Sequence, residues 1–129
     1  MQATPQLSPT PEVLYTVPIE LAERSYPILI GAGLLGNAQT YAGLPKAQAA
    51  MVVTNETIAP LYADAVCAAL SAHYAHVGRV VLPDGEAYKD WATLNHIFDA
   101  LLSAASDRKT VLFALGGGVV GDMTGFAAA

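Results

Sequence analysis

The sequence predicts a single α/β domain with a mostly parallel sheet, flanking helices and an N-terminal β-hairpin. Short apolar runs recur along the chain, amphipathic helical stripes separate them, and a glycine-rich turn follows the last run. Strand–helix alternation of this kind requires parallel strands joined by right-handed crossovers, and ligands bind such sheets beyond the carboxyl ends of the strands. Functional residues are therefore expected at those strand ends.

The N-terminal part of the chain predicts a tail and then a pair of strands. Residues 1–11 are polar and contain three prolines, which predicts a loose tail outside a domain that spans residues 12–129. Segments rich in β-formers follow at Val13–Val17 and Tyr26–Ile30. Pro18–Ser25 lies between them, so we expect either a hairpin or an irregular pair.

The remaining strands and helices alternate. Ala50–Thr54, Gly78–Leu82 and Thr110–Leu115 are short apolar runs, as expected of strands covered on both faces. Between them, two stripes with i, i+3, i+4, i+7 spacing predict amphipathic helices. The first stripe consists of Ile58, Leu61, Tyr62, Ala65, Val66, Ala69 and Leu70, and the second of Trp91, Leu94, Ile97, Phe98, Leu101 and Leu102.

The composition favours a globular domain that binds a small molecule. A chain of 129 residues with 53% hydrophobic residues can bury one core, and a net charge of −5 without a Lys/Arg cluster argues against a nucleic-acid partner. Cys67 is the single cysteine, so an internal disulfide is excluded and a reducing compartment is favoured. No basic, apolar leader and no run of eighteen apolar residues is present. We expect a cytoplasmic, soluble protein with a small-molecule ligand and no membrane partner.

The strongest functional signal is the glycine-rich turn Gly116–Asp122. It directly follows the apolar run and precedes a third expected helix over Val119–Ala129. Glycines let backbone N–H groups approach an anion, and the helix dipole adds positive potential at the same place, so a pyrophosphate is the expected ligand. A tight turn or close helix–strand packing explains the glycines equally well, and spacing alone leaves both interpretations open.

A second glycine motif competes with it. Gly31, Gly33 and Gly36 form a G-x-G-x-x-G pattern after an expected strand, and Glu56 follows twenty positions later. This motif meets the letter of the dinucleotide fingerprint better than the later turn does. The local pattern does not decide between the two.

Two further strand ends carry polar residues. Asn55 follows the first parallel strand and is a candidate for contacting adenosine or for capping the next helix. The loop from Asp84 to Lys89 follows the second strand, and Glu86 with Lys89 is a candidate for binding ribose hydroxyls, although a solvated turn is the alternative. Asp122 would repel a pyrophosphate, so it is expected to hold a hydroxyl or to be placed by the helix dipole.

The remaining titratable groups are expected to be structural. His73 and His76 are interpreted as solvated histidines at a helix end, because no carboxylate accompanies them at ligand spacing. His96 is expected on a helix surface. Cys67 is interpreted as a core thiol and not a nucleophile, with no basic neighbour to lower its pKa.

Taken together, four segments resemble bacterial 3-dehydroquinate synthases of the sugar phosphate cyclase superfamily. These are Arg24–Ile28, Val53–Thr57, Pro83–Glu86 with Lys89, and above all Ala114–Ala129. The resemblance extends from about Val13 to Ala129 and implies the Rossmann-like, NAD-binding N-terminal domain of that family. It also implies that NAD binds at the later strand ends, so that the Gly31 turn is structural. The implied cofactor-binding residues are Asn55, Asp84, Gly85, Glu86, Ala87, Tyr88, Lys89, Gly117, Gly118, Val119, Val120, Gly121 and Asp122.

The resemblance further implies the family reaction, in which 3-deoxy-D-arabino-heptulosonate 7-phosphate becomes 3-dehydroquinate and phosphate in the shikimate pathway of aromatic amino acid biosynthesis. NAD acts there catalytically with a divalent metal, zinc or cobalt, in a homodimeric enzyme. The family's metal ligands and phosphate-binding residues would follow Ala129, so no catalytic or metal-binding residue is assigned here, and the chain alone is expected to bind NAD without turnover. The alternatives are another sugar phosphate cyclase, a metal-dependent alcohol or glycerol dehydrogenase, and a non-catalytic nucleotide-binding module.

Overall fold

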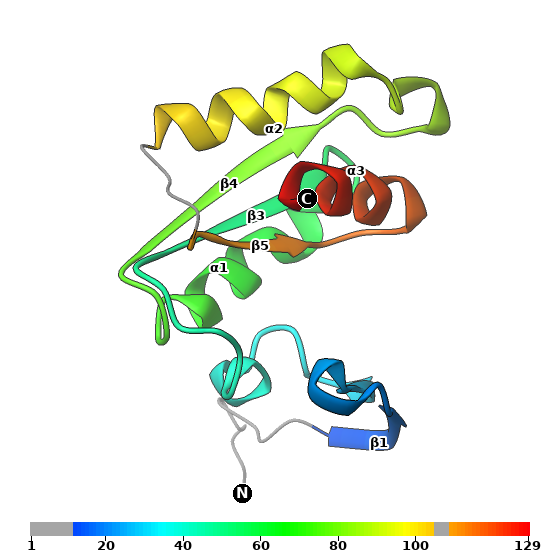
Figure 1. Cartoon of the computed structure of the whole chain (residues 1–129), viewed down its shortest axis with the longest axis vertical. Coiled ribbons are helices and arrows are strands. Elements are labelled where there is room, and N and C mark those ends of the chain that lie inside the picture. Colours follow the sequence, from blue (N-terminus) through cyan, green and yellow to red (C-terminus); the bar gives the residue numbers. More distant parts are fainter. Residues whose placement is uncertain (1–11, 105–108) are drawn as a thin grey trace, which may run out of the picture.

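The computed structural model describes residues 12–104 and 109–129, so the expected tail lies outside the described residues. It confirms an α/β fold with a parallel sheet, flanking helices and an N-terminal antiparallel hairpin (Figure 1). The strands are β1 (Glu12–Ile19), β2 (Tyr26–Ala32), β3 (Ala49–Asn55), β4 (His76–Leu82) and β5 (Val111–Ala114). The helices are η1 (Ala22–Arg24), η2 (Ala38–Tyr41), η3 (Ala59–Ala63), α1 (Asp64–Leu70), η4 (Glu86–Tyr88), α2 (Trp91–Ser103) and α3 (Gly118–Ala128).

The parallel sheet has the strand order β4-β3-β5, with β3 in the middle. Its register pairs Asn55 with Leu82 on one side and Val53 with Ala114 on the other. The expectation of strands covered on both faces holds for β3, whose residues from Ala50 to Asn55 are all buried. β4 and β5 are only partly buried because each is an edge strand among the described residues.

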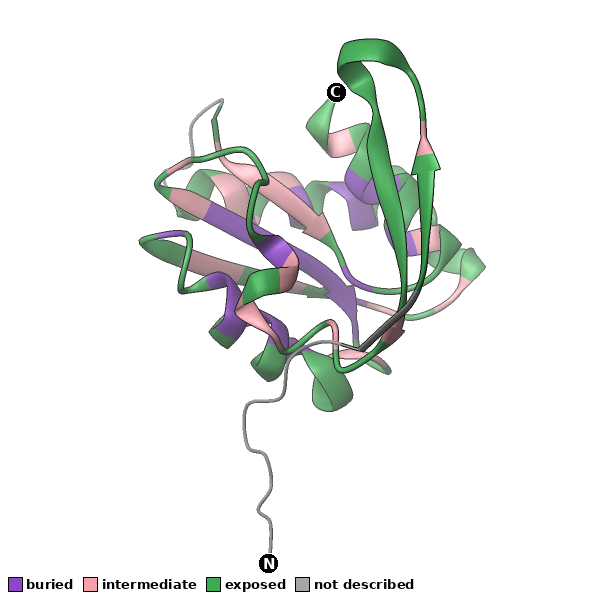
Figure 2. Ribbon diagram, turned by 90° about the horizontal axis from the view of Figure 1, so that it is seen from below, coloured by how far each residue is buried: buried purple, intermediate pink, exposed green. Residues whose placement is uncertain are grey.

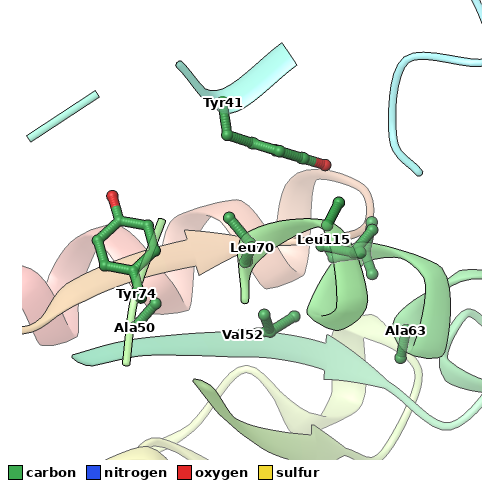
Figure 3. Close-up of a cluster of buried hydrophobic side chains, with 9 residues drawn as sticks. Tyr41, Ala50, Val52, Ala63, Leu70, Tyr74 and Leu115 are labelled. Carbon is green, nitrogen blue, oxygen red and sulfur yellow. The ribbon is translucent and has the colours of Figure 1, made fainter. Parts of the chain in front are cut away.

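Alternation along β3 divides the core between two faces, as expected for a period of two residues. Ala50 and Val52 face α1 and form one cluster with Leu70 and the two tyrosines Tyr41 and Tyr74 (Figure 3). The opposite face belongs to α2 and α3, and its cluster consists of Met51, Val53, Leu82, Leu94, Ile97, Val120 and Met123. Figure 2 shows the buried residues concentrated along the central strand and the inner sides of the helices. The sheet thus has helices on both sides.

Aromatic contacts connect the N-terminal part of the chain to the sheet. The Phe113 ring on β5 meets Tyr41 of η2 edge-on at 6.0 Å and Tyr74 at 5.8 Å between ring centroids. The hydroxyl of Tyr74 donates to Pro45 O at 2.8 Å, and that of Tyr41 donates to Leu35 O at 2.7 Å. These contacts hold the segment between the hairpin and β3 against the α1 face of the sheet.

β1 and β2 form a separate two-stranded sheet, which settles the hairpin alternative. The antiparallel register runs from Glu12 opposite Ala32 to Ile19 opposite Tyr26, with an irregularity between Val13 and Tyr15. The described side chains of the hairpin are almost all exposed (Figure 2). Its exposed large apolar residues are Tyr15, Val17, Leu21, Tyr26, Ile28, Leu29 and Ile30.

The helix predicted from the first apolar stripe is wrong in its first half. The segment Ala59–Ala63 is a π-helix, and only Asp64–Leu70 is α-helical. Because a π turn contains more residues than an α turn, a stripe drawn at α spacing loses its phase there. Leu61, Tyr62 and Ala65 are consequently exposed, whereas Val66, Ala69 and Leu70 are buried as expected.

The second stripe is confirmed in its centre and wrong at its ends. Leu94 and Ile97 are buried in α2, but Trp91 is 68% and Leu102 is 79% exposed. The end residues of α2 extend past the sheet face that buries the middle of the helix. Among the described residues, no helix has both the length and the apolar character that crossing a membrane would require.

Ile97→Ala is expected to lower the free energy of unfolding by about 2–5 kcal/mol, because the Ile97 side chain is fully buried and its removal leaves a cavity. Leu102→Ala on the same helix is the matched control, and its exposed side chain predicts a change within about 0.5 kcal/mol. Urea denaturation followed by circular dichroism measures both. Equal effects of the two substitutions would contradict the assignment of the buried face of α2.

Candidate functional site at the carboxyl edge of the sheet

The three strand ends singled out by the sequence lie at one edge of the sheet. Two backbone hydrogen bonds continue the ladders beyond the paired residues: Glu56 N donates to Leu82 O at 2.9 Å, and Leu115 N donates to Val53 O at 2.8 Å. The segments after β4 and β5 therefore leave the sheet on either side of Asn55. Ligands of open parallel sheets bind at such an edge.

Asn55 is held by three hydrogen bonds. Its Oδ1 accepts from the backbone N–H groups of Thr57 at 3.0 Å and Ile58 at 2.9 Å. Its Nδ2 donates to Asp84 Oδ1 at 3.3 Å. Asn55 therefore caps the turn that precedes η3, whereas the N-cap of η3 itself is Ile58, and one amide hydrogen of Asn55 has no partner among these bonds.

Asp84 connects the ends of β3 and β4. Besides the bond from Asn55, its Oδ2 accepts from Thr57 Oγ1 at 2.6 Å, and its backbone N donates to Glu56 Oε2 at 3.1 Å. Both carboxylate oxygens of Asp84 are thus engaged within the protein. The neighbouring Thr54 is also buried, but by alternation it shares the α1 face with Val52, and its hydroxyl has no hydrogen-bond partner among the described residues.

The loop after β4 reaches α3 through an ion pair. Gly85 has a φ of 130°, which starts the turn, and Glu86–Tyr88 then form one 3-10 turn. Lys89 Nζ lies 2.8 Å from Asp122 Oδ2 and 3.9 Å from Glu86 Oε2. The hydrogen bond to Asp122 raises the pKa of Lys89 above its ordinary value. Two of the segments predicted from the sequence are therefore in direct contact.

The glycine turn contains one glycine required by conformation and several that face open space. Gly116 has a φ of +154°, and a Cβ there would lie 3.0 Å from Cγ2 of Val120. A Cβ on Gly117, Gly118 or Gly121 would meet no atom within 4 Å. Packing within the described chain thus accounts for Gly116 only, and the other positions leave room for a ligand to approach the backbone.

The start of α3 offers hydrogen-bond donors to that space. Gly117 is the N-cap and has no side chain to cap the helix, and the first helical hydrogen bond runs from Gly121 N to Gly117 O at 3.0 Å. The N–H groups of the first turn have no carbonyl partner within a helix, and the dipole makes this end positive. The residues present therefore fit a phosphate group at Gly118–Val120.

A groove of about 530 Å³ lies between the start of α2 and α3. Its apolar wall is made by Trp91, Leu94, Met123 and Phe126, with Lys89, Asp90 and Asp122 beside it. Trp91 and Phe126 meet edge-on at 5.5 Å between ring centroids. Asp90 caps α2 by accepting from Thr93 N at 2.8 Å, and this bond lowers the pKa of Asp90 below its ordinary value. Of the residues predicted to bind the cofactor, only Lys89 and Asp122 line this groove.

The competing Gly31–Gly36 motif lacks the context of a dinucleotide site. Gly31 belongs to β2, which pairs antiparallel with β1 and has no part in the parallel sheet. Only the 3-10 turn Ala38–Tyr41 follows it, so no α-helix presents its N-terminus to the turn. The strand–turn–helix arrangement is found at Gly116–Gly118 instead.

Three expectations about titratable groups need revision. α1 ends at Leu70, so His76 is not at a helix end but begins β4, and the exposed His73 has its Nε2 2.7 Å from Ala38 O. The statement that Cys67 has no basic neighbour is wrong, because Arg79 on β4 lies beside it. Arg79 Nη1 donates a hydrogen bond to Asp64 Oδ1 at 2.9 Å, which raises the pKa of Arg79, and Cys67 adds to that shift. His96 is exposed on α2, as expected.

Sequence reasoning missed Thr57, Trp91 and Phe126 as residues of this edge. Thr57 lies within one of the segments that carry the family resemblance, but its partner Asp84 is 27 positions away, so no local pattern indicates the contact. The sequence assigns Trp91 only to the apolar stripe of the second helix. Its position in the first turn of α2, directly after the Asp90 cap, indicates that it lies near the carboxyl edge of the sheet.

Residues 79–129 match the family model described as 3-dehydroquinate synthase N-terminal. This match confirms the resemblance to 3-dehydroquinate synthases for residues 79–129. The matched segment contains both the Asp84–Lys89 loop and the glycine turn, whereas Asn55 precedes it.

Two solved structures share the fold of this chain. The crystal structure of 2-deoxy-scyllo-inosose synthase complexed with carbaglucose-6-phosphate, NAD+ and Co2+ has a TM-score of 0.76 and 20% sequence identity over 88% of this chain. A second crystal structure of 2-deoxy-scyllo-inosose synthase gives the same TM-score, identity and coverage. The chain spans 31% and 32% of the lengths of those two proteins.

Gly116→Ala is expected to lower the free energy of unfolding by about 1–3 kcal/mol, because the new Cβ meets Val120 and the backbone conformation disfavours a side chain. The matched control is Gly121→Ala, which places its Cβ in open space within α3 and is expected to raise stability by up to about 1 kcal/mol through helix propensity. Thermal and urea unfolding measure both. Equal destabilisation by the two would show that Gly116 has no special role.

Proposed function

We propose that residues 12–129 form the NAD-binding domain of a 3-dehydroquinate synthase. The observation that carries this proposal is the match of residues 79–129 to the N-terminal domain of that family, combined with the strand order that places the matched loop and glycine turn around Asn55. The same fold occurs in a 2-deoxy-scyllo-inosose synthase solved with NAD+. The open space at Gly117, Gly118 and Gly121 supports a backbone contact with the cofactor.

Each part of the cofactor has a proposed set of residues. The amides of the first turn of α3 bind the pyrophosphate, because they are unpaired donors at the positive end of a helix. Asn55 and the loop from Asp84 to Lys89 bind the adenosine side. Asp122 accepts from a hydroxyl of the nicotinamide ribose, and Lys89 compensates the Asp122 charge next to the phosphates. When bound, NAD supplies reversible hydride acceptance.

The cyclisation itself is proposed for a protein in which this domain is joined to the family's substrate- and metal-binding part. The described residues contain no group of three or more His, Cys, Asp or Glu side chains that could hold a metal ion. We therefore propose no metal-dependent step through the residues that the structure describes. The full enzyme is proposed to be a cytoplasmic homodimer that acts as a lyase with a zinc or cobalt ion.

The second candidate is another sugar phosphate cyclase, favoured by the TM-score of 0.76 to 2-deoxy-scyllo-inosose synthase. Both candidates use the same proposed cofactor site, so they differ in the substrate and not in the domain described here. Assays of the longest protein that contains this chain with 3-deoxy-D-arabino-heptulosonate 7-phosphate and with glucose 6-phosphate, followed by phosphate release, would separate the two.

Isothermal titration of the 129-residue chain with NAD is expected to give saturable binding of one molecule per chain. Adding salt is expected to weaken this binding, because the proposed contacts include the pyrophosphate charge. Titration with nicotinamide riboside, which lacks the pyrophosphate, serves as the control and should give no comparable affinity. Absence of NAD binding to the folded chain would refute the proposed function.

Gly118→Ala is expected to weaken NAD binding by at least about tenfold, because the new Cβ would meet the phosphates in the proposed complex. The free energy of unfolding is expected to change by no more than about 0.5 kcal/mol, because the same Cβ meets open space in the free protein. The control Gly125→Ala also places a Cβ in open space, two turns further along α3, and is expected to leave affinity unchanged. Unchanged affinity of the Gly118 variant would contradict the proposal that the pyrophosphate binds at this turn.

A further inference from the structure

The side-chain amide of Asn55 has only one hydrogen-bonding group left for a ligand. A carboxamide has two acceptor positions on oxygen and two N–H donors. Both acceptor positions are used by the N–H groups of Thr57 and Ile58, and one donor is used by Asp84 Oδ1. Asn55 is 8% exposed at the carboxyl end of β3, so its remaining N–H is the part that can reach the ligand edge.

The surrounding groups fix which way the amide points. If the amide were flipped, its oxygen would face the Asp84 carboxylate and its NH₂ would face two backbone N–H groups. An acceptor would then face an acceptor at Asp84, because an ionised carboxylate can only accept, and donors would face donors at the two backbone N–H groups. The orientation with nitrogen toward Asp84 is therefore the one that the protein stabilises.

Thr57 completes this arrangement from the other side of Asp84. Its hydroxyl donates to Asp84 Oδ2 at 2.6 Å, its backbone N donates to Asn55 Oδ1 at 3.0 Å, and Asn55 donates back to Asp84 Oδ1 at 3.3 Å. The three residues form a closed ring of hydrogen bonds across the ends of β3 and β4. With its second oxygen occupied by Thr57, Asp84 has a single carboxylate oxygen to offer to Asn55.

We infer that Thr57 is a positioning residue that acts through Asp84 to present Asn55 as a hydrogen-bond donor, so that the ligand atom at Asn55 is an acceptor, such as a ring nitrogen or hydroxyl oxygen of a nucleoside. This inference rests on the proposed NAD-binding function for the identity of the ligand. The orientation of the amide rests on the hydrogen bonds alone. The two parts can therefore be tested separately.

The first experiment compares Thr57→Val with Thr57→Ser by isothermal titration of the full chain with NAD. Removing the hydroxyl frees Asp84 and Asn55 to reorient, and affinity is expected to fall about tenfold, whereas serine restores the hydroxyl and is expected to restore affinity to within about twofold. The matched control is Thr40→Val, because the Thr40 hydroxyl also donates one hydrogen bond, at 2.6 Å to Leu34 O, but in η2 outside this edge. Thermal midpoints of all variants are measured in parallel.

The second experiment needs no ligand. In nitrogen-15 NMR spectra of the free chain, the Asn55 side-chain N–H pair is expected to be ordered and separate from exposed asparagine amides, and to shift toward them in Thr57→Val but not in Thr57→Ser or Thr40→Val. An Asn55 amide that is unchanged in Thr57→Val overturns the positioning role even where NAD binds. An amide that shifts as expected in a chain without NAD affinity upholds the positioning role and rejects the proposed function. Equal loss of affinity in Thr40→Val and Thr57→Val would assign the effect to general stability and overturn the inference.

Discussion

The parallel pairing of β3 with β4 on one side and β5 on the other is the constraint on which the site depends, because it fixes where three loops leave the sheet. β3 is buried on both faces, and each face has its own cluster of apolar side chains. A shift of register by one residue would exchange those two faces. The same register places Asn55 between the loop that begins after Leu82 and the turn that begins after Ala114, so the packing of the core also determines the geometry of the edge.

Most carboxylates at this edge accept hydrogen bonds from donors within the protein. Asp84 accepts from Asn55 and Thr57, Glu56 accepts from the backbone of Asp84, and Asp122 accepts from Lys89. The donors left for a ligand are the first amides of α3 and one N–H of Asn55. Of these donors, the amides at the start of α3 suit an anionic group, although the chain has a net charge of −5. The exposed Lys89–Asp122 pair contributes little to stability, so its effect is mainly to set the position of the loop relative to α3.

Local patterns in the sequence were enough to predict the strands, the end of α1 and the centre of α2, since burial imposes a period of two or of 3.6 residues. They failed where a residue's surroundings come from distant segments. They also failed at the π-helix Ala59–Ala63, where a local change of helix type shifts the phase of the stripe. The bond between Thr57 and Asp84 spans 27 positions and the one between Lys89 and Asp122 spans 33, so both require the strand order before they can be inferred. Arg79 beside Cys67 is a third case, because the two lie on different elements.

The two glycine motifs show why spacing alone does not identify a dinucleotide site. The motif at Gly31 satisfies the pattern but leaves an antiparallel hairpin and leads into a 3-10 turn, so no helix dipole is directed at it. The motif at Gly116 follows a parallel strand and opens an 11-residue helix. The glycines of the Gly116 motif differ in whether the protein requires them. Gly116 is required by its backbone conformation and by the contact that a side chain would make with Val120. Gly117, Gly118 and Gly121 have no neighbour that excludes a methyl group. Open space alone does not mark a ligand site, because Gly125 is equally open further along α3; at Gly117, Gly118 and Gly121 it leaves room for the proposed ligand to approach the backbone.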